Sequence, residues 1–129
     1  MVIANIIPIV FKFLEVPTTQ TTLRNVINYY QQDKLLMVFA CLTAGVVEEL
    51  LFRAYLMPRI EVFFKSGWIV VLLSSLIFGF AHMSGMSVVG IIVPILIGGL
   101  FSLHYYLYRN IASLVIVHFL IDFASFISA

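Results

Sequence analysis

Residues 35–57 read LLMVFACLTAGVVEELLFRAYLM, and the architecture expected for the whole chain follows from this run. The run is longer than the roughly 20 apolar residues that a helix needs to cross a bilayer. Its first part, 35–47, carries no charge, yet Glu48, Glu49 and Arg53 follow in quick succession. The run therefore predicts a transmembrane helix with charged side chains well inside it.

The composition of the chain also indicates a membrane protein. Of the 129 residues, 63% are hydrophobic and 10% are charged, whereas soluble domains average about half apolar and a quarter charged. The net charge of +1 comes without a basic patch, so nucleic acid is not an expected partner. Cys41 is the single cysteine, which excludes an intrachain disulfide. The expected partners are membrane lipid and a peptide or protein in the membrane, and nothing in the sequence indicates an oligomeric state.

Further apolar runs predict the other helices of the core. Between Ser66 and Tyr108 there is no Asp, Glu, Lys or Arg, which fits two helices separated by a short turn. The core helices are expected over about 34–57, 67–82, 88–108 and 111–127. The predicted fold class is all-α: a polytopic transmembrane helical bundle of about four core spanning helices plus a short N-terminal helix.

The N-terminal part of the chain has a different character. Residues 1–16 are apolar and end at Pro17, which makes them too short to span a bilayer. A polar segment follows, and Asp33 is placed to cap the next helix. The chain is therefore divided into 1–33, a short apolar helix with a polar connecting segment, and 34–129, the core.

The positive charges suggest an orientation in the membrane. With four spans, the 58–66 and 109–110 loops lie on the same side. That side carries three positive residues and the opposite side two: Arg59, Lys65 and Arg109 against Arg24 and Lys34. The positive-inside rule therefore predicts that the 58–66 and 109–110 loops are cytoplasmic.

Six ionisable side chains inside or near the spans are the candidate site: Glu48, Glu49, Arg53, His82, His118 and Asp122. A charged Asp, Arg or Lys at the centre of a span costs about 2.5–3.5 kcal/mol on insertion scales. Such groups persist when they pair inside the bundle, and they commonly mark function.

The spacing of these residues allows them to pair. Glu49 and Arg53 are four apart on one helix, in the favoured order for an ion pair. Glu48 is rotated by about 100° from Glu49, so it can face another partner. His118 and Asp122 are also four apart, so the carboxylate can hold the imidazole in one tautomer.

Less specific interpretations remain open for some of these residues. Arg53 could snorkel to the interface, and Asp122 could simply emerge from the membrane near the C-terminus. His104, beside a cluster of tyrosines, is expected at the interface and outside the site. Phe78 is expected to serve in packing.

Counting residues along the predicted helices tests whether the candidate groups can meet. At the helical rise, Glu48 lies ~15 Å and His118 ~12 Å from the side that holds the 58–66 loop. His82 lies ~21 Å from Trp68 by the same count. The sequence therefore predicts that Glu48 and His118 lie at matching depths, with His82 deeper.

Three stretches resemble motifs of one known family. The stretch 48–53, EELLFR, resembles the EExxxR motif of the CAAX-protease and bacteriocin-processing family, also called the ABI family. The stretch 78–82, FGFAH, resembles its FxxxH motif, and 118–122, HFLID, resembles its HxxxN or HxxxD motif. The three occur in order, each on a predicted span, and the resemblance covers about residues 34–127.

The resemblance implies an intramembrane endopeptidase without a cofactor, with residues 34–129 as the protease core. It implies CAAX-type processing, bacteriocin maturation or self-immunity, and a location in a prokaryotic plasma membrane. Glu48 would activate water, and His82 would position that water. His118 and Asp122 would stabilise the oxyanion, while Glu49 and Arg53 would support the site. The sequence departs from the family in its short length and in Asp122, since an ionised Asp cannot donate a hydrogen bond.

Two other functions remain as alternatives. His82, His118 and Glu48 could bind zinc in a metal-dependent protease, because two histidines and an acid make a credible ligand set. The chain could instead be a non-enzymatic immunity protein or ion relay, since intramembrane acids and histidines also mark proton paths.

Overall fold

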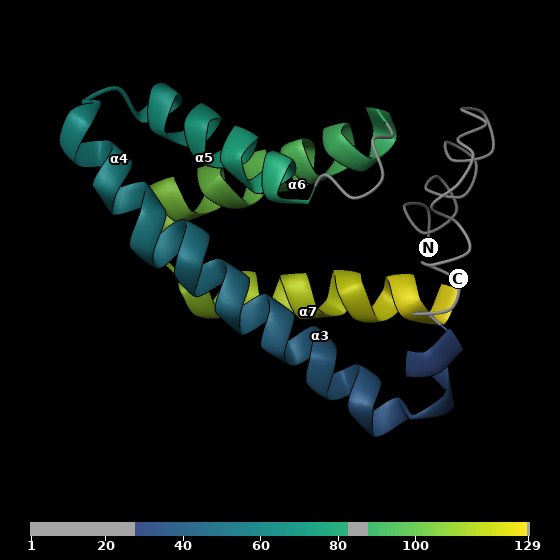
Figure 1. The fold of residues 1–129 in the computed structure, drawn as a ribbon. Helices are drawn as coiled ribbons and strands as arrows, with labels where there is room; N and C mark the ends of the chain where they lie inside the picture. Colours follow the sequence, from purple (N-terminus) through teal and green to yellow (C-terminus); the bar gives the residue numbers. More distant parts are fainter. Residues whose placement is uncertain (1–27, 83–87, 129) are drawn as a thin grey trace.

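The computed structural model describes residues 28–82 and 88–128. Within these ranges the chain forms helices and no strand, as the all-α prediction requires. The predicted helix over 1–16 lies outside the described residues. The elements, shown in Figure 1, are α3 (Lys34–Glu49), η1 (Leu50–Leu56), α4 (Met57–Phe63), α5 (Gly67–Ala81), α6 (Val88–Tyr108) and α7 (Ile111–Ser128).

The first core helix is longer than predicted. Its α3, η1 and α4 segments form one helical stretch of 30 residues, Lys34–Phe63, so the expected end at Met57 is wrong. Pro58 would normally clash with the carbonyl four residues before it. Here a π-helical segment precedes the proline, and the N–H of Met57 donates to the carbonyl of Phe52, five residues back. We attribute the continuation through Pro58 to this wider turn, which changes the carbonyl spacing.

The start of α3 is fixed by a cap and by a contact with the far end of the chain. The Asp33 side chain accepts hydrogen bonds from the N–H groups of Leu35 and Leu36, which confirms its predicted capping role. Just before it, Gln31 Nε2 donates to the carbonyl of Phe126 in α7 over 2.6 Å. The two ends of the described core are therefore tied together.

Not every core helix reaches spanning length. In the described ranges, three apolar helices are long enough to cross a membrane: Lys34–Phe63, Gly90–Tyr108 and Ile111–Ser128. The 15 residues of α5 extend only about 22 Å, short of a hydrocarbon core of about 30 Å. The bundle thus contains three full spans and one shorter apolar helix.

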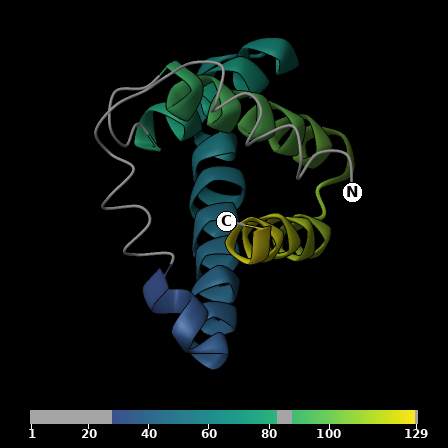
Figure 2. The ribbon, with the colours of Figure 1, turned by 90° about the vertical axis from the view of Figure 1, so that its right-hand side faces the viewer.

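The helices form two pairs that diverge from a common base. Helix α5 packs along α6, and α3 packs on α7, whereas α6 and α7 make few contacts. Both pairs meet around η1 and separate towards the other end of the molecule (Figures 1 and 2). At the base, an ion pair between Glu61 of α4 and Arg109 joins the two loops that were predicted to share one side. The hydrogen bond that Arg109 donates to the Glu61 carboxylate raises the pKa of Arg109.

A glycine sets the close approach of α3 to α7. A Cβ atom at Gly45 would lie 3.2 Å from the carbonyl oxygen of Val115 and 3.6 Å from the Cβ of His118. Contacts this tight leave room for a hydrogen atom only. The glycine therefore lets α3 and α7 cross at the level of the candidate site.

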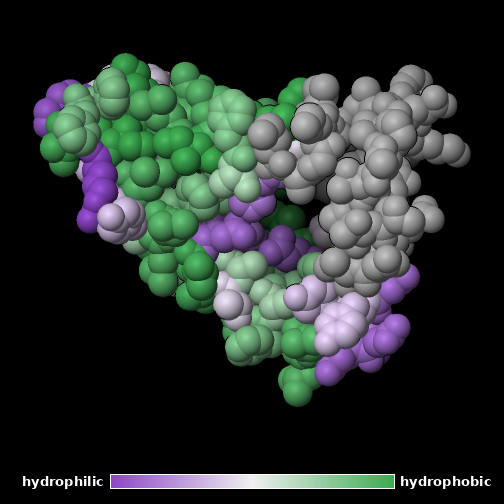
Figure 3. Space-filling model, in the orientation of Figure 1, coloured by the Kyte–Doolittle hydropathy of each residue, from purple (hydrophilic) through white to green (hydrophobic). Residues whose placement is uncertain are grey.

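The distribution of polarity is inverted relative to a soluble protein. Many large apolar side chains are exposed along every helix, where lipid can solvate them. The buried polar and charged side chains are Glu49, Arg53, Ser74, Ser75, Ser102 and His118. On the face shown in Figure 3, a hollow with a hydrophilic interior interrupts a mainly hydrophobic surface. Among the described residues, the buried polar side chains therefore lie inside the bundle.

Candidate active site

The centre of the site is an ion pair removed from solvent. Glu49, at the end of α3, and Arg53, on η1, are both 0% exposed, and Arg53 Nη1 lies 3.0 Å from Glu49 Oε1. The i, i+4 spacing predicted this pair, and the burial of Arg53 shows that it does not snorkel to the interface. Two opposite charges in a low-dielectric interior must stay together, because an unpaired buried charge is very costly.

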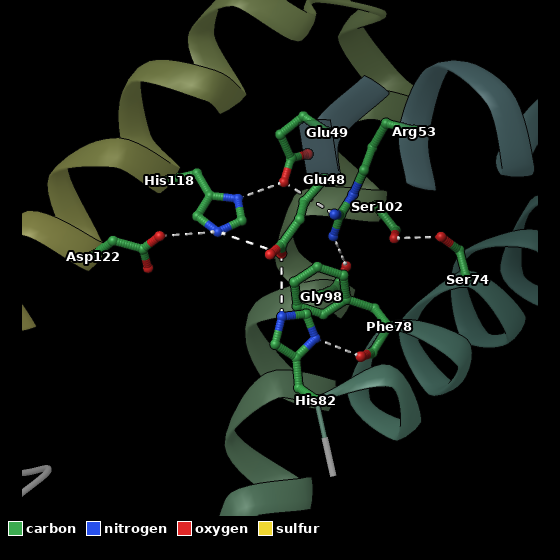
Figure 4. Close-up of polar contacts among 10 residues, drawn as sticks. All are labelled: Glu48, Glu49, Arg53, Ser74, Phe78, His82, Gly98, Ser102, His118 and Asp122. Atoms are coloured by element: carbon green, nitrogen blue, oxygen red, sulfur yellow. Dashed lines mark hydrogen bonds and ion pairs between the residues drawn. The ribbon is translucent and has the colours of Figure 1, made fainter. Parts of the chain in front are cut away.

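Glu49 also orients His118. The same oxygen, Glu49 Oε1, lies 2.8 Å from His118 Nδ1 (Figure 4). A carboxylate can only accept, so His118 Nδ1 carries the hydrogen and donates it. The sequence predicted that Asp122 can hold this ring in one tautomer, and Asp122 Oδ2 does lie 3.5 Å from the other nitrogen, Nε2. The contact with Glu49 is shorter and was not predicted; it forms because Gly45 brings α7 within reach of α3.

Glu48 contacts a second histidine, His82. Glu48 Oε2 lies 3.1 Å from His82 Nε2, at the C-terminal end of α5. The predicted difference in depth between Glu48 and His82 disappears, because the first helix ends at Phe63 rather than at Met57. Glu48 lies fifteen residues before Phe63 and His82 fifteen after Gly67, so each is about 22 Å from the α4–α5 connection.

The other ring nitrogen of His82 contacts its own helix. His82 Nδ1 lies 2.8 Å from the carbonyl oxygen of Phe78, which can only accept, so Nδ1 carries the hydrogen. Nε2 is therefore the nitrogen that faces Glu48 Oε2, 3.1 Å away.

Asp122 completes the cluster from α7. Its Oδ2 lies 3.5 Å from His118 Nε2, and Glu48 Oε2 lies 3.7 Å from the same nitrogen. Asp122, Glu48 and His82 are 30%, 26% and 34% exposed. These three groups are thus open to an incoming molecule, whereas the Glu49–Arg53 pair beneath them is sealed.

The sequence did not predict the second hydrogen bond of Arg53. Arg53 Nη2 donates to the carbonyl of Gly98 in α6 over 3.1 Å. The guanidinium also lies 4.6 Å from the ring centre of Phe78 and 5.5 Å from that of Phe101. A backbone acceptor such as this carbonyl leaves no signal in the pattern of side chains along the sequence. Arg53 therefore links both helix pairs.

A buried hydrogen bond joins α5 to α6 next to this arginine. Ser102 Oγ donates to Ser74 Oγ over 3.1 Å, and both side chains are fully buried. His104 lies elsewhere, 3.0 Å from Ser113 Oγ near the α6–α7 turn, as expected for a residue outside the site. The six predicted site residues, in contrast, all gather in one cluster (Figure 4).

The arrangement suits hydrolysis more readily than a preformed metal site. In the part of the chain that the structure describes, no group of three His, Cys, Asp or Glu side chains has the geometry of metal ligands. The carboxylate of Glu48 lies beside His82, and a second histidine, His118, faces the same oxygen. A proton acceptor and a potential oxyanion donor at one place are the groups that amide hydrolysis requires.

Comparison with known proteins identifies the family. Residues 31–124 match the family described as "Type II CAAX prenyl endopeptidase Rce1-like". This range covers 94 of the 129 residues and contains all six site residues. Neither the search of curated proteins nor that of solved structures gave a match. With three membrane-spanning helices and this match over most of its length, the chain belongs to the Rce1-like family of type II CAAX prenyl endopeptidases, which are membrane proteases.

Proposed function

We propose that this protein is an intramembrane endopeptidase in which Glu48 activates the attacking water. The observation that carries the proposal is the contact of Glu48 Oε2 with His82 Nε2 at 3.1 Å, in a side chain that is 26% exposed. A water bound to the ionised Glu48 transfers a proton to it while the oxygen attacks the peptide carbonyl. The family match supports peptide-bond hydrolysis as the reaction.

His118 is placed to stabilise the oxyanion that forms. Glu49 accepts the hydrogen of Nδ1, so Nε2 is the nitrogen that faces Glu48 and Asp122. The imidazolium form carries a proton on both nitrogens and can donate from Nε2 to the oxyanion. Asp122, when ionised, can only accept, so it acts on the oxyanion through His118.

The leaving group then needs a proton. When the carbon–nitrogen bond breaks, the proton taken from water by Glu48 passes to the amine, directly or through His82. Glu48 returns to its ionised form and the products are a carboxylic acid and an amine. Glu49 and Arg53 remain beneath the site and keep His118 in place.

The substrate class follows from the family name and the membrane location. We propose a membrane-associated peptide or protein of the CAAX type, with bacteriocin processing or self-immunity as the other roles. We also propose that the 58–66 and 109–110 loops face the cytoplasm of a prokaryotic cell, because they carry the larger share of positive charge.

A metal-dependent protease is the second candidate. It is favoured by one observation: the Nε2 atoms of His82 and His118 both point at Glu48 Oε2, at 3.1 and 3.7 Å. Zinc accepts histidine nitrogens and a carboxylate as ligands, and it would lower the pKa of a bound water.

One experiment tests the function and separates these candidates. The purified protein in proteoliposomes is given a membrane-anchored CAAX peptide, and cleavage is followed by mass spectrometry with and without a chelator. The glutamate mechanism predicts cleavage that the chelator leaves unchanged. Cleavage that the chelator abolishes and zinc restores would establish the metal mechanism, and no cleavage of any membrane peptide would refute the protease assignment.

A further inference from the structure

Asp122 is the acid of the cluster that is held least closely. Glu49 Oε1 lies 3.0 Å from Arg53 and 2.8 Å from His118, and Glu48 Oε2 lies 3.1 Å from His82. Asp122 reaches His118 Nε2 only at 3.5 Å, beyond the range of about 2.7–3.2 Å that is usual for a hydrogen bond. In Figure 4 this single contact, through one of its two oxygens, is the one that joins Asp122 to the cluster.

The Asp122 carboxylate therefore has capacity left for another partner. An ionised carboxylate has about four lone-pair positions at which it can accept a hydrogen bond. The nitrogen it faces, His118 Nε2, is also approached by Glu48 at 3.7 Å. Asp122 belongs to α7, a helix long and apolar enough to cross a membrane, and its side chain is 30% exposed. Acids in spanning helices almost always pair, so we expect a donor from outside the chain.

The charges of the cluster indicate the sign of that partner. Three carboxylates stand against two histidines and one permanent cation, Arg53. The Arg53 side chain is 0% exposed and donates to Glu49 and to the carbonyl of Gly98. Its charge is thus already balanced and closed off from an incoming molecule. The open part of the site consists of two carboxylates, Glu48 and Asp122, and the two histidines.

No other cation of residues 28–82 and 88–128 lies near Asp122. The remaining lysines and arginines of these ranges are Lys34, Arg59, Lys65 and Arg109. Lys34 begins α3, fourteen residues or about 21 Å before Glu48. The other three lie at the base, and Asp122 is eleven residues, or about 16 Å, beyond the first residue of α7.

We propose that Asp122 selects substrates that carry a cationic side chain, Lys or Arg, next to the bond that is cleaved. In the proposed function, His118 Nε2 meets the oxygen of the reacting carbonyl, and Asp122 lies 3.5 Å from that nitrogen. A long, flexible lysine or arginine side chain adjacent to the bond can extend to this carboxylate. The inference rests on the proposed function and adds a residue that determines the specificity of the same site.

The apolar surroundings strengthen this selection. A cation inside a membrane protein is costly unless it pairs, and Asp122 supplies the opposite charge. An acidic side chain would instead place a third negative charge beside Glu48 and Asp122. Two charges 4 Å apart interact about four times more strongly near a protein surface than in bulk water. Because Asp122 is partly exposed, we expect a preference for a cationic over a neutral side chain on the order of 10-fold.

The experiment measures a ratio of rates. Mass spectrometry first locates the cleaved bond in a membrane-anchored peptide, and each flanking residue is then replaced in turn by Lys, norleucine or Glu. Norleucine has a chain of similar length to Lys without the charge. Wild type, Asp122→Asn and Glu61→Gln are compared in proteoliposomes by the kcat/KM of the Lys peptide divided by that of the norleucine peptide. Any loss that Asp122→Asn causes through His118 affects both peptides and cancels in this ratio.

At one of the two flanking positions, the ratio is expected to be on the order of 10 for wild type and Glu61→Gln. It should fall to about 1 for Asp122→Asn, and wild type should cleave the Glu peptide most slowly. Glu61→Gln removes a carboxylate at the base, outside the site, and serves as the matched control. A wild-type ratio of about 1 at both positions, or a ratio that Asp122→Asn leaves unchanged, would overturn the proposal.

A second readout does not depend on cleavage. The Glu48→Gln protein is crosslinked to photoreactive versions of the Lys and norleucine peptides at equal concentration. Stronger crosslinking of the Lys peptide, lost in a Glu48→Gln/Asp122→Asn protein, is the expected result, and equal crosslinking of both peptides would contradict it. If the Lys peptide is preferred while wild type cleaves nothing, the cation-binding role stands and the protease assignment fails. Cleavage by wild type without a charge preference would show the reverse.

Discussion

At the residue scale, Glu49 organises the site. One of its oxygens contacts both Arg53 Nη1 and His118 Nδ1, at 3.0 and 2.8 Å. The charge of Arg53 balances Glu49, while the hydrogen bond fixes which nitrogen of His118 faces Glu48 and Asp122. Glu48, one position earlier, lies beside His82. The two adjacent glutamates therefore make different contacts, because successive side chains of a helix point in directions about 100° apart.

Arg53→Ala should destabilise the protein strongly, because it leaves the buried Glu49 carboxylate without its counter-charge. Breaking a buried pair from one side costs on the order of 3–5 kcal/mol. Thermal unfolding of the detergent-solubilised protein measures the effect, with Arg59→Ala as the control. Arg59 is an exposed arginine on α4, so its loss should change little. Equal melting temperatures for Arg53→Ala and wild type would mean that the Glu49–Arg53 pair contributes nothing to stability.

At the scale of single elements, the sequence predicted helices better than it predicted their ends. Four helices could be predicted because a long apolar stretch in a bilayer must satisfy its backbone hydrogen bonds internally, which a helix does. They were expected over 34–57, 67–82, 88–108 and 111–127. The continuation through Pro58 was not predictable in this way. It depends on a π-helical segment, Leu50–Leu56, whose residues look like those of an ordinary helix. The resulting error of six residues was enough to place Glu48 at the wrong depth relative to His82.

Gly45→Leu should separate α3 from α7 and so disrupt the Glu49–His118 contact. The added side chain would meet the carbonyl of Val115 and the Cβ of His118. Overpacking of this kind costs about 1–3 kcal/mol, against a gain of up to about 1 kcal/mol in helix propensity. We expect a lower melting temperature together with loss of proteolysis. Val46→Leu, on the exposed neighbouring position, is the control, and a fully active Gly45→Leu protein would refute the tight crossing.

At the scale of the whole molecule, the site exists because two helix pairs share one base. The motifs showed which residues belong together, and the resemblance to one family implied their roles. The sequence of an apolar helix gives little information about which other helix it packs against, because lipid and protein surfaces are equally apolar. The pairing of α3 with α7 and of α5 with α6, and the bond from Arg53 to the carbonyl of Gly98, therefore appeared only in the structure.

The arrangement of the loops predicts an orientation in the membrane that can be measured. Lys65 lies in the α4–α5 connection, and Lys34 lies at the opposite end of the first helix. With Cys41 replaced by Ser, Lys65→Cys and Lys34→Cys should react with a membrane-impermeant thiol reagent from opposite sides of sealed vesicles. Labelling of Lys65→Cys from the cytoplasmic side is expected from the charge distribution. Labelling of both positions from one side would contradict the span of Lys34–Phe63.

The central claim is that Glu48 is the base that activates water, and Glu48→Gln tests it most directly. The amide preserves the shape of the side chain but cannot take a proton from water. Loss of a general base typically costs about 10²–10⁴-fold in rate. The measurement is cleavage of a membrane-anchored peptide by purified protein in proteoliposomes, with Glu61→Gln as the matched control outside the site. We predict that Glu48→Gln folds and melts like wild type but loses cleavage to this extent, while Glu61→Gln remains active. Cleavage by Glu48→Gln at the wild-type rate would contradict the account.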